Sequence, residues 1–256
     1  MGGLSVELIP ALRDNYIYLV RDLETNTTAV VDPAESAPVV EALSRRGWTL
    51  DLILNTHHHG DHTGGNADLK SRYGARLIGP AAEKRRIAGM DETVAEGDTV
   101  TIGASVGRVL ETPGHTSGHI VYHFADSAIL FAGDTLFVLG CGRLFEGTPE
   151  DMWSSLSKLL PMPDETLVYC GHEYTVANAR FAVTVDPLNR ALESRAREVE
   201  DMRARLEPTI PTTMGQERAT NPFLRPDDPG IRHALDMVDA ETVAVFAEIR
   251  ARKDAF

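Results

Sequence analysis

Thr56-His57-His58-His59-Gly60-Asp61-His62 directly follows the apolar run Leu52-Ile53-Leu54, and no other part of the sequence says as much about the protein. Side chains alternate along an extended backbone, so His57 and His59 are expected to point the same way. As the chain turns, Asp61 and His62 can project towards a second point nearby. Imidazole and carboxylate groups suit zinc, iron or manganese. The segment therefore predicts a strand end that supplies ligands to two metal ions.

Further ligands are expected at the ends of other strands, because seven residues cannot complete the coordination of two metals. Three candidates each follow an apolar run and a glycine: His115, Asp134 and His172. Residues that leave neighbouring strands at one edge of a sheet can converge on one site. Taken singly, Asp134 fits a turn or N-cap residue and each histidine fits a packing residue. The recurrence of one pattern favours a shared metal site.

The chain before residue 174 is predicted to mix short strands with helices. Strands are expected near Tyr16–Val20, Ala29–Val31, Leu52–Leu54, Val106–Leu110, Ile120–Phe124, Ala128–Phe131 and Leu167–Tyr169. Helical patterns lie near Val39–Arg46, Gly65–Tyr73 and Pro149–Leu160, the last with Thr148 as N-cap. The early strands follow one another without helices, which favours mixed rather than purely parallel sheets.

After Tyr174 the pattern becomes helical. Apolar residues recur at helical spacing at Leu188, Leu192, Val199 and Leu206, and Pro208 and Pro211 are expected to end that helix. Residues 209–230 are predicted to form a Pro-rich connector. Two further helical patterns follow, at Ile231, Leu235 and Val238 and at Val243, Phe246, Ala247 and Ile249. We therefore predict a catalytic domain at residues 1–174 and an all-helical domain at residues 175–256.

Composition limits the classes of function. The 256 residues include 25 Lys and Arg and 38 Asp and Glu, a formal charge of −13, which argues against a general binder of nucleic acid or anionic membranes. The sequence shows no run of about 18 apolar residues, which a membrane-spanning helix would need. It also shows no secretory signal pattern, in which a basic segment is followed by an apolar one. Cys141 and Cys170 cannot form a disulfide framework and indicate a reducing compartment, so we predict a cytoplasmic protein. A monomer or weak homo-oligomer is expected.

The pattern His57-X-His59-X-Asp61-His62, followed by His115, Asp134 and His172, resembles the metallo-β-lactamase superfamily motif. This resemblance implies an α/β (α+β) fold, the αββα sandwich. Four further segments resemble glyoxalase II, the hydroxyacylglutathione hydrolases, and extend the similarity through the helical tail: Cys141–Thr148, Gly171–Thr175, Asn221–Arg225 and Arg250–Asp254.

The resemblance also implies roles for individual residues. One divalent metal would be bound by His57, His59 and His115, a second by Asp61, His62 and His172, and Asp134 would bridge them. We expect zinc, with iron or manganese as alternatives, and His57, Asp61 and Asp134 as the catalytic residues. Glutathione would be bound by Arg143, Phe145, Tyr174, Arg250 and Lys253. Arg143 stands where the family often has Lys, and Phe145 stands where it often has Tyr and so lacks a hydroxyl.

Three neighbouring residues have open roles. Asp32 fits either an acceptor that holds a ligand histidine or a simple turn residue before Pro33. His58 and His119 are expected to support the ligands rather than to bind metal.

The implied reaction is hydrolysis of S-(2-hydroxyacyl)glutathione, typically S-D-lactoylglutathione, to glutathione and D-lactate, the second step of methylglyoxal detoxification. Two metals about 3.5–4 Å apart can lower the pKa of a shared water towards about 7, so that a metal-bridged hydroxide attacks the thioester.

Other functions of the same fold remain as alternatives. The first is a glutathione-persulfide dioxygenase with a mononuclear iron, which can share the histidine motif. A β-lactamase has no use for the helical tail, and a nuclease is disfavoured by the charge of −13. An inactive scaffold is disfavoured because all seven ligand positions are intact.

Overall fold

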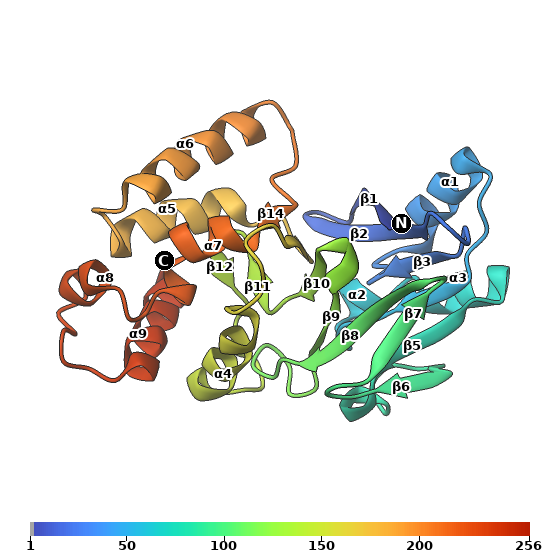
Figure 1. The fold of residues 1–256 in the computed structure, drawn as a ribbon, viewed down its shortest axis with the longest axis horizontal. Helices are drawn as coiled ribbons and strands as arrows, with labels where there is room; N and C mark the ends of the chain where they lie inside the picture. Colours follow the sequence, from blue (N-terminus) through green and yellow to red (C-terminus); the bar gives the residue numbers. More distant parts are fainter. Residues whose placement is uncertain (1–2) are drawn as a thin grey trace. The chain divides into compact units, whose positions relative to one another are not determined.

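The structure is a computed structural model and describes residues 3–256 (Figure 1). The chain forms two compact units. The first runs to Glu111 and also contains Ser117–Gly133, and the second contains Thr112–Thr116 and Asp134–Phe256. The boundary expected at residue 174 is a different division of the chain and stays a prediction. Within residues 3–256, no helix combines the length and the apolar character needed to cross a bilayer.

The first unit contains a six-stranded mixed sheet whose strand order follows the chain. Its strands are β1 (Leu4–Ala11), β2 (Asn15–Asp22), β3 (Thr28–Val31), β4 (Leu52–Leu54), β5 (Arg76–Pro80) and β6 (Glu92–Val94). The pairs β1–β2 and β2–β3 are antiparallel, and the pairs from β3 to β6 are parallel. Parallel neighbours need a crossover, which α1 (Ser36–Arg46) and α3 (Asn66–Tyr73) supply. The predicted mixed sheet is confirmed.

Helices α1 and α3 cover one face of this sheet (Figure 1). Leu43 of α1 and Leu69 of α3 are fully buried and belong to the same apolar cluster as Ile17 and Leu19 of β2. Because side chains alternate along a strand, Tyr18 faces the opposite way. Its ring lies 5.7 Å from that of Phe131, which belongs to a second sheet of the unit.

That second sheet has the antiparallel order β10-β9-β8-β7 within this unit. Its strands are β7 (Thr99–Ile102), β8 (Ser105–Glu111), β9 (Ile120–Phe124) and β10 (Ile129–Gly133). The short helices of the unit are α2 (Gly60–Thr63), η1 (Ala81–Glu83) and η2 (Ala125–Ser127). The Phe124 and Phe131 rings are 6.1 Å apart and fully buried, so an aromatic core separates the two sheets.

The second unit combines two pairs of short antiparallel strands with helices. The strands are β11 (Leu136–Phe137) with β12 (Gly140–Cys141), and β13 (Leu167–Cys170) with β14 (Thr212–Thr213). The helices are α4 (Pro149–Leu159), α5 (Thr175–Val185), α6 (Arg190–Ala204), α7 (Met214–Thr220), η3 (Pro222–Leu224), α8 (Pro229–Ala234) and α9 (Thr242–Ala255). The Thr148 side chain caps α4 by accepting from the Asp151 N–H, which confirms the predicted start of that helix.

Three expectations for the tail are wrong, and one of them is Val238, which lies beyond α8 (Pro229–Ala234) and is 58% exposed. Leu188 and Leu206 lie outside α6 and are 82% and 83% exposed, whereas Leu192 and Val199 are fully buried. Apolar spacing alone overextended the helix, which begins after the N-cap Asn189. The stretch from 209 to 230 is not a plain connector, because it contains β14, α7 and η3.

Candidate metal centre

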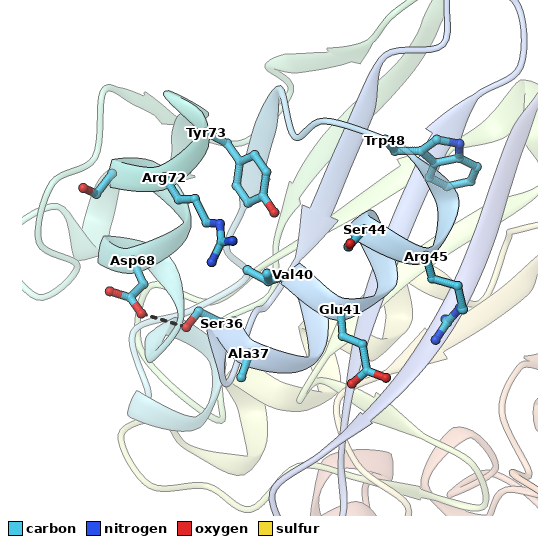
Figure 2. Close-up of a pocket in the computed structure, with 11 residues that line it drawn as sticks. Ser36, Ala37, Val40, Glu41, Ser44, Arg45, Trp48, Asp68, Arg72 and Tyr73 are labelled. Carbon is cyan, nitrogen blue, oxygen red and sulfur yellow. Dashed lines mark hydrogen bonds between the residues drawn. The ribbon is translucent and has the colours of Figure 1, made fainter.

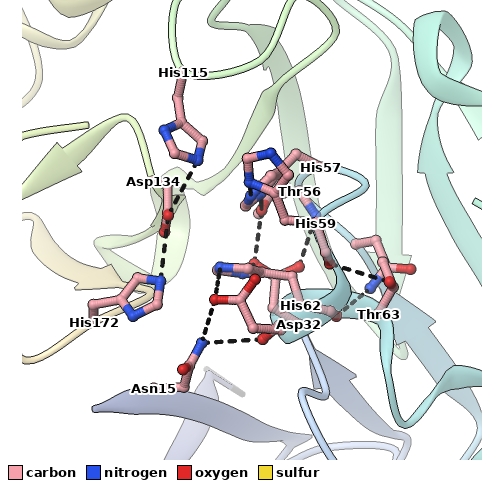
Figure 3. A network of polar contacts seen from close by, with 12 residues as sticks. Asn15, Asp32, Thr56, His57, His59, His62, Thr63, His115, Asp134 and His172 are labelled. Carbon is pink, nitrogen blue, oxygen red and sulfur yellow. Dashed lines mark hydrogen bonds and ion pairs between the residues drawn. The ribbon is translucent and has the colours of Figure 1, made fainter. Parts of the chain in front are cut away.

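The histidine-rich turn of the first unit is anchored by a buried carboxylate. Asp32 Oδ1 accepts a hydrogen bond from the Thr56 N–H (2.8 Å), and Asp32 Oδ2 accepts one from Thr56 Oγ1 (2.7 Å). Asp32 and Thr56 are 3% and 0% exposed. Because β4 ends at Leu54, these bonds fix the backbone between the end of the strand and His57 (Figure 3).

His57 and His59 bring two ring nitrogens together. His57 Nε2 lies 3.1 Å from His59 Nδ1, and His57 is fully buried. Zinc binds imidazole nitrogen at 2.0–2.1 Å, so neighbouring nitrogens in a tetrahedral shell stand about 3.3 Å apart. The observed spacing therefore suits two ligands of one ion, and the same-side orientation expected from strand geometry is present.

His62 faces the same carboxylate. Its Nδ1 lies 3.1 Å from Asp32 Oδ2, and the ring is 1% exposed. Asp32, His57 and His62 each offer a ligand atom within 4.8 Å of the other two. A carboxylate that holds one ring nitrogen of a histidine fixes the ring and its tautomer for metal binding by the other nitrogen. Of the two roles left open for Asp32, the structure supports the acceptor.

Asp61 is held by a residue that sequence reasoning missed. Asn15 Nδ2 donates to Asp61 Oδ2 (3.1 Å) and to the Asp61 carbonyl oxygen (3.0 Å). Asn15 is 5% exposed and begins β2, whereas the Asp61 side chain is 39% exposed. This contact orients the carboxylate. The two residues are 46 positions apart, and no local pattern signals their pairing.

His58 and His119 each have a buried neighbour in this region. His58 Nδ1 lies 3.0 Å from the buried carboxylate of Glu83. The His119 ring stacks on the His57 ring at 4.8 Å. Gly133 has a φ of +47°, and a Cβ there would come within 2.6 Å of His119 Nε2, so only glycine fits beside this stack.

The second unit holds the other candidate ligands. His115 Nε2 and His172 Nε2 each lie 3.3 Å from the same atom, Asp134 Oδ2 (Figure 3). All three residues are 5% exposed. Zinc–ligand lengths of 2.0–2.2 Å place neighbouring donor atoms about 3.3 Å apart. His115, Asp134 and His172 are thus spaced as neighbouring ligands of a divalent metal would be.

The rings around Asp134 are fixed by neighbouring contacts. His115 Nδ1 donates to the Arg143 carbonyl oxygen (2.9 Å), which leaves Nε2 as the nitrogen for a metal. The His172 ring is stacked on Tyr174 at 4.7 Å with 3° between the planes. Gly142 packs against Asp134 so closely that a Cβ would lie 2.0 Å from its carbonyl oxygen.

The predicted substrate residues of this unit differ in exposure. Phe145 is 62% exposed, and its ring lies 5.2 Å from His115. Tyr174 is 39% exposed, and Arg143 is exposed. Phe145 and Tyr174 therefore present exposed aromatic surface beside His115 and His172.

Lys253 and Arg250 are more enclosed. Burial lowers the pKa of Lys253, and the positive charges of Arg250 and Arg143 lower it further by electrostatic repulsion, to about 8. Lys253 Nζ donates to the Ala177 carbonyl oxygen (2.9 Å). Arg250 is 5% exposed, and its Nη1 donates to the Cys141 carbonyl oxygen (3.0 Å). It therefore also has a structural role, because this bond links α9 to β12.

A surface groove of about 1170 Å³ lies elsewhere in the first unit (Figure 2). Its lining comes from α1, α3 and the segment after α1, and includes Val40, Trp48, Asp68, Arg72 and Tyr73. None of the candidate ligand or substrate residues lines it. The groove is therefore separate from the candidate metal residues.

Two family models of known proteins match this chain, one over each of two consecutive stretches. The family model for the metallo-β-lactamase superfamily matches residues 11–172, and the model for the hydroxyacylglutathione hydrolase C-terminus matches residues 173–256. The first match fixes the fold as that of the metallo-β-lactamases. A solved structure, TTHA1623 in a di-iron-bound form, has a TM-score of 0.60 and 25% identity, over 84% of this chain and 98% of that one.

Relatives that match from end to end narrow the class further. The hydroxyacylglutathione hydrolase of Rhizobium meliloti is 54% identical over 256 residues, all of both chains. That of Methylococcus capsulatus is 52% identical over 253 residues, 99% of both. The chain belongs to the hydroxyacylglutathione hydrolase family of the metallo-β-lactamase superfamily.

Proposed function

We propose that this protein hydrolyses S-(2-hydroxyacyl)glutathione thioesters, with S-D-lactoylglutathione as the substrate and glutathione and D-lactate as the products. The observation that carries the proposal is identity above 50% along the whole chain with hydroxyacylglutathione hydrolases. The C–S bond breaks and one water is consumed. The water oxygen becomes part of the carboxylic acid, and a water proton goes to the glutathione sulfur. The reaction is the second step of methylglyoxal detoxification.

The proposed cofactor is a pair of divalent metal ions, with zinc as the expected metal. In this assignment His57, His59 and His115 would hold one ion, Asp61, His62 and His172 would hold the other, and Asp134 would be a ligand of both. The donors fit, since all are imidazole nitrogens or carboxylate oxygens and the spacings of 3.1 and 3.3 Å match neighbouring ligand atoms. The di-iron-bound relative gives independent support for a dinuclear site.

The side chains of the protein prepare this chemistry. When bound, divalent metals supply an activated water near neutral pH and positive charge for the carbonyl oxygen. Asp32 holds the His62 ring, and the Arg143 carbonyl oxygen holds the His115 ring. Asp134, His57 and Asp61 are the residues proposed to act nearest the reacting atoms. The leaving thiol has an ordinary pKa of about 8.5, so its thiolate departs without a strong general acid.

Glutathione recognition is proposed for the second unit. Arg143, Lys253 and Arg250 form a local group of positive charge in a protein of net charge −13, which suits an anionic tripeptide. Tyr174 and Phe145 add aromatic surface beside His172 and His115. We accordingly propose residues 1–174 as the catalytic domain and 175–256 as the glutathione-binding domain.

The compartment, partners and oligomeric state of the protein are proposed on chemical grounds. Cys141 and Cys170 are both buried and neither forms a disulfide, which suits a reducing cytoplasm. The acidic charge disfavours nucleic acid as a partner. A monomer or weak homo-oligomer remains our expectation.

The direct test is release of free thiol from S-D-lactoylglutathione, with metal content measured on the same sample. We expect turnover with two metals per chain, and loss of turnover in Asp134→Ala and His57→Ala. Two bound metals without turnover would reject the substrate. One iron per chain, with oxygen consumed on glutathione persulfide, would replace the hydrolase by the dioxygenase. Full turnover in Asp134→Ala would reject the site assignment.

A further inference from the structure

The β11–β12 hairpin of the second unit lies next to several candidate site residues. It is preceded by Asp134 and followed by Gly142 and Arg143, and the Gly142 N–H donates to the Thr135 carbonyl oxygen (3.2 Å), which closes its base. The Arg143 carbonyl oxygen in turn accepts from His115 Nδ1 (2.9 Å). A shift of this hairpin would therefore move both the His115 ring and the Arg143 side chain.

The tip of the hairpin is held by side chains from the helical region. Asn178 Nδ2 donates to the Val138 carbonyl oxygen (3.0 Å), and Glu217 Oε2 accepts from the Leu139 N–H (2.8 Å). Leu139 has a φ of +58°, a conformation that needs support from its surroundings. The tip thus depends on polar residues more than 30 positions away in the chain.

Asn221 holds both sides of the same tip. Its Nδ2 donates to the carbonyl oxygens of Gly140 (3.0 Å) and Phe137 (3.2 Å), and to Glu217 Oε2 (2.9 Å). The Phe137 ring stands edge-on to His172 at 6.0 Å. The network therefore reaches the neighbours of both candidate histidines of this unit.

Glu217 is the centre of the network. It is fully buried, and it accepts three hydrogen bonds, from Leu139, Asn221 and Thr212 Oγ1 (2.8 Å). Burial raises its pKa, the sign that the surroundings penalise the charged form. Burying a carboxyl group has a desolvation cost in free energy that an apolar residue of similar size would not have. The use of Glu217 lies in the backbone groups that it fixes.

We propose that Glu217 and Asn221 are positioning residues, which set the His115 ring and the Arg143 side chain through the β11–β12 hairpin. The inference rests on the proposed function, because it gives these residues a purpose only if His115 binds metal and Arg143 binds substrate. Neither residue is one of the candidate ligand or substrate residues.

The test compares three variants of the full-length protein. Glu217→Ala removes all three acceptor contacts. Glu217→Gln keeps one oxygen for Leu139 and Asn221, while its amide can donate to the Thr212 hydroxyl. Asp186→Ala is the matched control, since Asp186 is a 4% exposed carboxylate of the same unit that pairs with Arg225 and Asn189. For each we measure zinc affinity by competition with a chromophoric chelator, KM and kcat for S-D-lactoylglutathione, and Tm.

We expect Glu217→Ala to weaken zinc binding and raise KM by about 10-fold each, as for residues that orient metal ligands. Glu217→Gln should restore both to within about 2-fold. Asp186→Ala should lower Tm and leave zinc affinity and KM unchanged. Glu217→Ala with a lower Tm but wild-type zinc affinity and KM would overturn the proposal, as would a zinc affinity reduced equally in Asp186→Ala.

If Glu217→Ala does not fold, Asn178→Ala removes only the bond to Val138, and zinc affinity and KM equal to wild type in that variant would count against the proposal. A wild type that binds zinc but does not hydrolyse the thioester would reject the proposed function, whereas zinc affinity across the variants would still decide the positioning role.

Discussion

His62 Nδ1 lies 3.1 Å from Asp32 Oδ2, and both side chains are buried. The same Asp32 carboxylate accepts two hydrogen bonds from Thr56, one residue before His57. One acid therefore fixes both the backbone where the histidine-rich turn begins and the ring of a candidate ligand near its end. The turn is preorganised by this carboxylate.

Asp32→Asn tests that relationship. The amide keeps the size of the side chain, but it can no longer accept from every one of these donors. We expect zinc affinity to fall by about 10-fold to 100-fold, measured by chelator competition. Asp22→Asn is the control, because Asp22 is a buried carboxylate of the same unit that bonds Ser105 and Thr25 instead. Equal zinc affinities in the two variants would contradict the role given to Asp32.

Asn15→Ala probes the contact that orients Asp61. Removing the amide deletes both donations to Asp61 and weakens the restraint on its carboxylate. We expect the metal content after dialysis to drop, with an affinity loss of about 10-fold. Asn15→Asp, which replaces the donor by an acidic group facing Asp61, should be worse than Asn15→Ala. An Asn15→Ala protein with unchanged metal content would show that Asp61 needs no such support.

Gly142→Ala tests how tightly the chain packs at Asp134. The added Cβ would lie 2.0 Å from the Asp134 carbonyl oxygen and 3.2 Å from His115 Cβ, so the backbone must shift. We expect a loss of about 1–3 kcal/mol in the free energy of unfolding, together with weaker zinc binding. Gly60→Ala makes the same change beside His59, where the added Cβ would meet no atom within 4 Å beyond its chain neighbours and its own helix backbone, and should leave stability nearly unchanged. Similar losses in both variants would contradict the packing argument.

The candidate ligands could be predicted from sequence because their signals are local. His57 to His62 lie in one short segment, and His115, Asp134 and His172 each follow an apolar run and a glycine. The orienting residues could not be predicted in the same way. Asn15 meets Asp61 across 46 positions, and Glu217 meets Leu139 across 78. Such pairs exist only once the chain has folded.

The errors in the tail also have a physical reason. Leu188 and Leu206 continue the apolar spacing of Leu192 and Val199, but helix ends are set by capping rather than by spacing. Asn189 accepts from the Leu192 N–H and starts α6, so an N-cap signal was present in the sequence and excluded Leu188. Likewise, Thr213 and Gln216 form a capping box that starts α7 inside the expected connector.

Acid stability should depend on Asp22. Burial alone would raise its pKa, but hydrogen bonds from Ser105 and Thr25 outweigh burial and lower the pKa from 3.8 to about 2. A group with a depressed pKa in the folded state stabilises the fold above its unfolded pKa, and that contribution is lost as pH falls from 3.8 towards 2. We expect the free energy of unfolding in urea to decline across this window. Asp22→Asn should be less stable at pH 5 and should show a flatter decline; parallel curves would contradict the assignment.

Substrate affinity should depend on the protonation of Lys253. Burial and the charges of Arg250 and Arg143 lower its pKa from 10.5 to about 8, so the ammonium loses its proton only slightly above neutral pH. An anionic glutathione conjugate would then lose one positive partner, and we expect KM to rise as pH increases from about 7 to 9. The sign for stability is the opposite. The unfolded chain binds more protons between pH 8 and 10.5, so this group makes the fold more stable as pH rises through that interval.

Lys253→Met separates these effects from other titrations. It keeps the length of the side chain and removes the charge, so KM should be higher at pH 7 and should change less up to about pH 9. Lys253→Arg, which stays charged throughout, should hold KM low across the same range if its planar head fits beside Arg250 and Arg143. Steady-state kinetics on S-D-lactoylglutathione at fixed ionic strength supply the measurement. A Lys253→Met protein whose KM follows the wild-type pH profile would place the titrating group elsewhere in the protein.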